Sequence, residues 1–288
     1  MTLSVVIITH NEESNLARTL ESVRPLMADG KGEIIVVDSG STDKTVEIAK
    51  SFGAKVFIEE WKGFAAQKNS AIDKATGDWI LSLDADEELD HDLQQALADT
   101  LEGLERVAVL SQQANAHPFT VDDAKSDVAY HAGVKLDNEF NGLCIPRKNE
   151  FLGRWVKHGG YWPDPKLRFF RRGSGKFENR AVHEDLHITG NTGQIRYGAL
   201  LHHSYPTLSD YIEHMNRYSS LGAEMVVADG KVGFGVVNIV LRPLLTFIYN
   251  YFFRLGFLDG REGLLLHLNH AVYVSWKYAK TWELSRKR

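Results

Sequence analysis

The sequence predicts an α/β protein built on a mostly parallel sheet. Short apolar, β-branched runs alternate with segments of helical periodicity over the first ninety residues. Continuous apolar runs of this kind are typical of strands that are buried on both faces. Strand–helix alternation with buried strands indicates parallel pairing through right-handed crossovers.

Each element is predicted from its local pattern. The predicted strands are Leu3–Thr9, Glu33–Val37, Lys55–Ile58 and Trp79–Leu83. The predicted helices run from Leu16 to Val23, through Val46–Ala49, from Phe64 to Lys74 and from His91 to Leu104. Pro25 ends or kinks the first helix. Phe140–Trp155 is expected to form one or two strands, and Lys166–Arg172 another.

Three of the predicted strands end in polar residues. Thr9, Asp38 and Asp84 stand at the carboxyl ends of their strands. In open α/β sheets ligands bind outside these ends. The three residues should therefore line one crevice.

The strongest chemical feature is Asp84-Ala85-Asp86 at the end of the fourth strand. Residues i and i+2 of a strand point to the same side, so the two carboxylates can converge. Paired carboxylates suit Mg²⁺ or Mn²⁺ held together with a substrate diphosphate. Glu88 shares this side by spacing and is a third candidate ligand. The alternative is a solvated acidic strand end.

Composition argues against a nucleic-acid-binding protein and against a disulfide-stabilised secreted one. The chain has 288 residues, 25% of them charged, and a net charge of −5, which gives no basic field for nucleic acid. Cys144 is the single cysteine, so there is no internal disulfide framework, and it is interpreted as a packing residue. The first residues lack the basic region of a signal peptide, so a cytoplasmic protein is expected.

Three ordered motifs resemble the family 2 glycosyltransferases with the GT-A fold. They are Val5-Val6-Ile7-Ile8-Thr9-His10-Asn11-Glu12-Glu13, Val36-Val37-Asp38-Ser39-Gly40-Ser41-Thr42-Asp43 and Leu83-Asp84-Ala85-Asp86-Glu87. The resemblance implies a nucleotide-sugar donor, a divalent metal and inversion at the anomeric carbon.

The resemblance also assigns donor-binding residues. Thr9, Asn11, Glu12 and Asp38 would hold uracil, with Asp38 accepting its imide proton. Lys68 would reach the diphosphate. Asp84 would take part in both donor and metal binding. Apart from the resemblance, the alternation of basic and apolar residues in Lys166–Arg172 indicates that Arg168 faces the crevice and meets phosphate with its planar guanidinium, or else belongs to a basic outer face.

A catalytic base is expected in Val182-His183-Glu184-Asp185-Leu186, a hundred residues beyond Asp84. An inverting transfer needs one carboxylate to take the acceptor proton. A Val-His-Glu element marks a subgroup that this chain resembles and favours Glu184, whereas the general family pattern favours Asp185. His183 is a further metal or diphosphate candidate.

The chain is expected to divide into a GT-A catalytic domain, residues 1–206, and a helical region, residues 207–288. Thr207 or Ser209 would cap its first helix. The apolar run Phe234–Phe257 contains Arg242-Pro243, which argues against a simple membrane span. Apolar, aromatic and basic residues together predict docking on an anionic membrane surface. Packing on another subunit is the alternative.

Together these features predict an inverting glycosyltransferase that moves a sugar, with glucose expected, from a UDP-sugar to a lipid-linked saccharide. Tyr161-Trp162-Pro163-Asp164 and Gly256-Phe257-Leu258-Asp259-Gly260 resemble bacterial lipopolysaccharide core β-glucosyltransferases. The inner core would then be the acceptor, at the cytoplasmic face of the inner membrane. A polyprenyl-phosphate glycosyltransferase and a non-catalytic nucleotide-sugar-binding scaffold are the alternatives.

Overall fold

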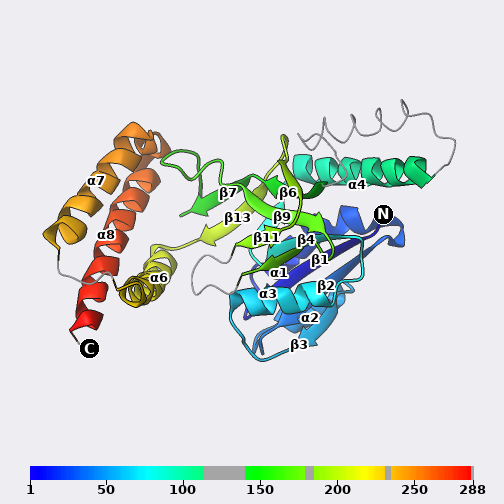
Figure 1. The fold of residues 1–288 in the computed structure, drawn as a ribbon, viewed down its shortest axis with the longest axis horizontal. Helices are drawn as coiled ribbons and strands as arrows, with labels where there is room; N and C mark the ends of the chain where they lie inside the picture. The colour runs from blue at the N-terminus through cyan, green and yellow to red at the C-terminus, as the bar shows by residue number, and fades with distance from the viewer. Residues whose placement is uncertain (113–139, 179–184, 231–234, 287–288) are drawn as a thin grey trace. The chain divides into compact units, whose positions relative to one another are not determined.

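The computed structural model describes residues 1–112, 140–178, 185–230 and 235–286 (Figure 1). The chain divides into two compact units. The first contains the described residues of 1–147, 165–178 and 185–202, and the second contains those of 148–164 and 203–286.

A seven-stranded sheet of order β12-β6-β9-β4-β1-β2-β3 forms the centre of the first unit. Strands β3, β2, β1 and β4 are parallel neighbours, while β9 runs antiparallel to β4 and β6. The strands are β1 (Leu3–Thr9), β2 (Gly32–Asp38), β3 (Lys55–Ile58), β4 (Trp79–Asp84), β6 (Phe140–Ile145), β9 (Lys166–Arg171) and β12 (Asn191–Gln194). The prediction of a mostly parallel α/β sheet is confirmed.

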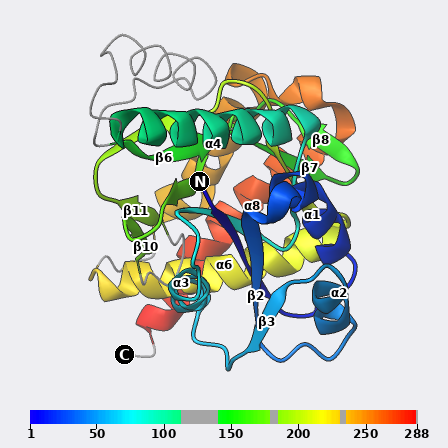
Figure 2. The same ribbon diagram turned by 90° about the vertical axis from the view of Figure 1, so that its right-hand side faces the viewer.

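Helices cover both faces of this sheet (Figure 2). Alternate β1 residues contact opposite cores: Val5 packs with α1, α2 and α4, and Val6 packs with α3. The helices are α1 (Leu16–Val23), α2 (Thr45–Ser51), α3 (Phe64–Asp73) and α4 (His91–Gln112). Pro25 lies in η1 (Arg24–Gly30), a 3₁₀ segment that continues α1. The predicted end or kink at Pro25 is therefore confirmed.

Smaller strand pairs complete the first unit. Strand β5 (Glu87–Leu89) pairs with β13 (Leu200–Tyr205), and β10 (Gly175–Phe177) pairs with β11 (Leu186–Ile188). The turn between β4 and β5 therefore holds the Asp84 and Asp86 carboxylates at the carboxyl end of β4.

Phe140–Trp155 holds three short strands instead of the expected one or two: β6, β7 (Arg147–Phe151) and β8 (Arg154–Val156). Pro146 separates the first two. Leu152 and Gly153 both have positive φ, 52° and 79°, and join β7 to β8 in a tight hairpin. Two such residues in succession define a type I′ turn. Leu-Gly is not the usual Asn-Gly signal for it, so sequence reasoning missed the turn.

The second unit is mainly helical. Thr207 caps α6 (Leu208–Ala228) in a reciprocal capping box with Asp210, so the predicted cap at Thr207 is confirmed. Helix α8 packs against both α6 and α7 (Figure 1). The remaining elements are η2 (Val237–Leu241), α7 (Arg242–Ile248), η3 (Tyr249–Phe253), η4 (Gly256–Asp259) and α8 (Gly260–Ser285). No helix among the described residues is long and apolar enough to cross a bilayer.

Candidate active site

Asp38 is wholly buried at the carboxyl end of β2. Its Oδ2 accepts hydrogen bonds from the hydroxyl of Thr9 at 2.8 Å and of Ser41 at 2.5 Å. Its Oδ1 accepts from the backbone N–H groups of Gly40 and Ser41 at 3.0 and 2.8 Å. A carboxylate offers about four lone-pair sites. All four are used, so a further donor would have to displace one, and Ser41 carries the less buried of the two hydroxyls that can rotate.

The loop after β1 is joined to the loop after β2. Asn11 has φ 56°, a left-handed conformation that Asn tolerates. Its N–H donates to Ser41 Oγ at 2.8 Å, and its Oδ1 accepts from Thr42 N at 2.8 Å. Glu12 N–H donates to Thr45 Oγ1 at 2.7 Å. Burial, together with the negative charges of Asp86, Asp43 and Asp84, raises the pKa of Glu12.

Asp84 is held between two cations. Its Oδ1 lies 2.8 Å from Lys68 Nζ, and its Oδ2 lies 2.5 Å from Arg168 Nη2. Both cationic side chains are buried, and the Lys68 ammonium also lies over the ring of Phe177. Burial alone would raise the pKa of Asp84, but Arg168 and Lys68 hold it well below its usual range. Asp84 is therefore a stable anion.

Arg168 also contacts Glu87, a residue without an assigned role in the sequence. Glu87 is wholly buried, and its Oε1 accepts from Arg168 Nη2 at 2.7 Å and from Arg147 Nη1 at 3.1 Å. Its Oε2 accepts the backbone N–H of Asp84 at 3.1 Å. A basic outer face for β9 is thus wrong at Arg168, whose guanidinium is buried among carboxylates.

Asp86 is paired with a histidine. His202 Nε2, on β13, lies 3.3 Å from Asp86 Oδ2. Burial raises and His202 lowers the pKa of Asp86, and the net effect is a lowered value. Sequence reasoning did not place a histidine beside Asp86, and the adjacent pair His202-His203 was the signal that could have found it. Side chains of adjacent strand residues point to opposite sides. His203 accordingly faces another residue, with its Nδ1 2.5 Å from Glu150 Oε2.

Helix α1 supports the Asp84–Glu88 turn. Thr19 Oγ1 donates to Ala85 O at 2.6 Å, and Arg18 Nε lies 3.0 Å from Glu88 Oε2. Arg18 therefore competes with a metal for this oxygen of Glu88.

The predicted base segment is only partly described. His183 and Glu184 lie outside the described residues. Asp185 is exposed, and its carbonyl accepts the backbone N–H of Glu178 at 3.1 Å. This bond places the start of β11 beside the end of β10.

Among the described residues, no group of three or more His, Cys, Asp or Glu side chains is arranged to hold a metal ion. Asp86 and His202 nevertheless supply a carboxylate and an imidazole close together. Divalent ions at such sites take one or two protein ligands together with substrate phosphates. The residues present therefore fit a metal whose shell a diphosphate completes. Asp84 fits the ligand role less well, because two cations cover its oxygens.

A sheet of this order, with acidic residues at the ends of its parallel strands, defines a GT-A glycosyltransferase fold. A mannosyltransferase from Pyrobaculum calidifontis, solved with GDP-mannose and Mn²⁺, shares the fold with a TM-score of 0.50 and 14% identity. The alignment covers 99% of this chain and 88% of that one.

The chain belongs to glycosyl transferase family 2, whose family model matches residues 4–177. It is 29% identical over 292 residues to the lipopolysaccharide core biosynthesis glycosyltransferase LpsC of Rhizobium meliloti, covering 98% of this chain and 92% of LpsC. It is 50% identical over 285 residues to an uncharacterised glycosyltransferase of Rickettsia bellii, covering 98% and 87%. The predicted family is confirmed.

Proposed function

We propose that this glycosyltransferase transfers a sugar, with glucose expected, from a UDP-sugar to a lipid-linked saccharide of the lipopolysaccharide inner-core type, with inversion. The observation that carries the proposal is the set of acidic residues at the carboxyl ends of the two strands that flank β1: Asp38 at the end of β2, and Asp84 and Asp86 at and just after the end of β4, with Lys68 and Arg168 beside Asp84. The likeness to LpsC, named for lipopolysaccharide core biosynthesis, supports this acceptor class.

The donor would be bound in two parts. Thr9, Asn11, Glu12 and Asp38 would hold the nucleoside, with the uracil imide replacing the Ser41 hydroxyl at Asp38. The diphosphate would be bound near Asp84, where Lys68 and Arg168 supply two cationic groups that can contact phosphate oxygens. Asp84 keeps both cations in place, since it neutralises them in the absence of the donor.

Asp86 and His202 would hold Mg²⁺ or Mn²⁺, with Asp84, Glu88 and His183 as further candidates. When bound, the metal neutralises charge that builds on the leaving diphosphate. The protein would contribute the position of Asp86, which the pairing of β5 with β13 brings to His202.

Glu184, or Asp185 in the general family pattern, would take the proton of the acceptor hydroxyl. That oxygen forms a bond to the anomeric carbon as the bond from this carbon to the diphosphate oxygen breaks. One displacement converts an α-linked donor into a β-linked product. The proton ends on the carboxylate and the electron pair on the diphosphate.

Residues 1–206 would form the catalytic domain, and residues 207–288 would bind an anionic membrane surface at the cytoplasmic face of the inner membrane. A lipid-linked acceptor is confined to a membrane, so an enzyme that binds the same surface meets it more often.

The test is a screen of nucleotide-sugar donors for metal-dependent nucleotide release, with and without a lipopolysaccharide acceptor that lacks outer sugars. UDP-glucose should release UDP with Mn²⁺ or Mg²⁺, and the acceptor should gain one β-linked hexose. Release that is unaffected by EDTA, or with no preference among nucleotides, would reject the proposal.

A further inference from the structure

Two apolar stripes on the helix formed by η2, α7 and η3 face away from the rest of the second unit. Val237, Leu241, Leu245, Tyr249 and Phe253 recur at every fourth position, and each is 45–75% exposed. Val236, Val240, Leu244 and Phe252 form the neighbouring stripe and are 52–62% exposed. Large exposed apolar patches on soluble proteins mark interaction sites.

The π-helical turns keep these stripes on one side. In an α-helix each residue turns about 100°, so positions four apart drift by roughly 40° per step. Over sixteen residues the stripe would wind to the opposite side. Segments η2 and η3 are π-helical, with wider turns that reduce this drift. The four-residue period of the sequence and the π turns therefore produce one continuous apolar face.

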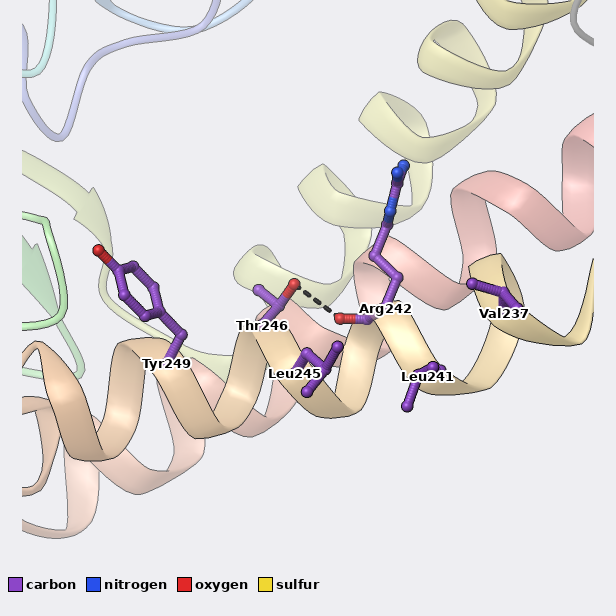
Figure 3. A pocket seen from close by; sticks show the side chains of 6 residues that line it. All are labelled: Val237, Leu241, Arg242, Leu245, Thr246 and Tyr249. Carbon is purple, nitrogen blue, oxygen red and sulfur yellow. Dashed lines mark hydrogen bonds between the residues drawn. The ribbon is translucent and has the colours of Figure 1, made fainter.

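The other side of the same helix is attached to α8. Ser275 Oγ donates to the carbonyl of Ile239 at 2.9 Å, and Arg242 contacts the hydroxyl of Tyr278. Figure 3 shows Leu241 and Arg242 projecting to opposite sides. A shallow hollow of about 360 Å³ is lined by Val237, Leu241, Arg242, Leu245, Thr246 and Tyr249. The stripes are thus the uncovered face of a helix already packed on its opposite side.

The charged residues of this part of the chain indicate which partner binds the apolar face. Residues 235–258 contain no acidic residue but include Arg242 and Arg254. Residues 235–288 contain eight Lys or Arg and three Asp or Glu, a net charge of +5 in a chain whose total is −5. Apolar and aromatic side chains beside cations are typical of helices that lie in the plane of an anionic bilayer.

We propose that these two stripes are the membrane-inserted surface of the protein: the helix lies in the bilayer plane, its apolar side chains enter the acyl boundary, and the net positive charge of residues 235–288 attracts this part of the chain to anionic lipid. This inference rests on the proposed function in one respect: a lipid-linked acceptor explains why the protein would bind a membrane.

The test uses the full chain and vesicles of phosphatidylglycerol and phosphatidylcholine. Changing Leu241, Leu245 and Phe253 together to Gln should weaken co-sedimentation at least tenfold, since each loses an apolar side chain that the bilayer would bury. Ile58, Val109 and Tyr197 are also exposed but lie outside residues 207–288, and changing them to Gln is the matched control that should bind as the unaltered chain does. Because all six side chains are exposed, both variants should keep their helical circular dichroism.

Full binding by the face variant, or an unaltered chain that never binds anionic vesicles, would overturn the proposal. A stable dimer that the face variant dissociates would overturn it in favour of a second copy of the chain. Nucleotide release from the donor in free solution separates the two hypotheses. Its absence from the unaltered chain rejects the proposed function, whereas vesicle binding reports on the surface alone.

Discussion

The Arg168 guanidinium links Glu87 to Asp84: one nitrogen, Nη2, lies 2.7 Å from Glu87 Oε1 and 2.5 Å from Asp84 Oδ2. Glu87 contacts no ligand in the proposed function. Glu87 positions Arg168, which in turn contacts Asp84, and it accepts a hydrogen bond from the Asp84 backbone N–H. We regard Glu87 as a positioning residue for the Asp-x-Asp turn.

Glu87→Gln should destabilise the protein and raise the donor KM. The change removes the buried carboxylate that Arg147 and Arg168 share, and breaking a buried ion pair typically costs about 3–5 kcal/mol. Thermal unfolding and donor kinetics measure both effects. Glu105→Gln is the control: it removes an exposed carboxylate paired with Lys31 and should change stability by no more than about 0.5 kcal/mol. Equal effects of the two changes would contradict the role of Glu87.

His202→Ala should increase the Mn²⁺ concentration needed for half-maximal activity by at least the roughly 10–100-fold that loss of a residue behind a metal ligand typically costs. Asp86→Ala should remove activity altogether, because it deletes the carboxylate that is best placed to bind the metal. His203→Ala is the matched control, since this neighbour faces Glu150 instead. Nucleotide release measured over a range of Mn²⁺ concentrations would rank the three variants by their metal requirement. An unchanged Mn²⁺ requirement in His202→Ala would exclude His202 as a ligand.

Asp38→Asn should raise the donor KM by about 10–100-fold, the loss expected for one hydrogen bond to a charged group. The amide also disturbs the bonds from Gly40 and Ser41, so stability must be measured in parallel. The metal requirement should stay unchanged, because Asp38 lies on a different strand from Asp86. A donor KM equal to that of the unaltered enzyme would place the nucleoside elsewhere.

Glu184→Gln should lower kcat by about 10²–10⁴-fold while donor binding survives, since a positioned base contributes that much. Asp185→Asn is the paired variant and should remain active. The opposite result would assign the base to Asp185. If both variants stay active, the base lies elsewhere in the chain. Single-turnover transfer with a saturating donor separates chemistry from binding.

The melting temperature should fall as the pH drops from about 4.5 to 2. Hydrogen bonds from Lys55, Ser4 and Thr76 outweigh burial and lower the pKa of Glu33 to about 2. Lys74 and its neighbours do the same for Glu59. A carboxyl whose folded pKa is depressed stabilises the protein above its unfolded pKa, and this contribution is lost as the pH falls through the folded value. Glu33→Gln with Glu59→Gln should flatten the fall measured by thermal scans. An equally steep fall would mean that other carboxyls control acid unfolding.

The sequence by itself determined the architecture of the first ninety residues. Leu3–Thr9 and Lys55–Ile58 are strands at the predicted bounds, because local apolar runs and turn residues act over a few positions. The order of the motifs along these strands predicted the family, which is confirmed. The Thr207 cap was predicted for the same reason, since its partner Asp210 is three residues away.

Only the tertiary structure determined which charged side chains form ion pairs. Glu87 contacts Arg147 and Arg168 across 60 and 81 residues, and Asp86 meets His202 across more than a hundred. No local pattern encodes such pairs, because they depend on how β4, β5, β9 and β13 are aligned. The exposed face of Val237–Phe253 was likewise decided by the packing of the opposite side on α8 and by its π turns. Sequence periodicity describes one element at a time, whereas burial and ion pairing arise between elements.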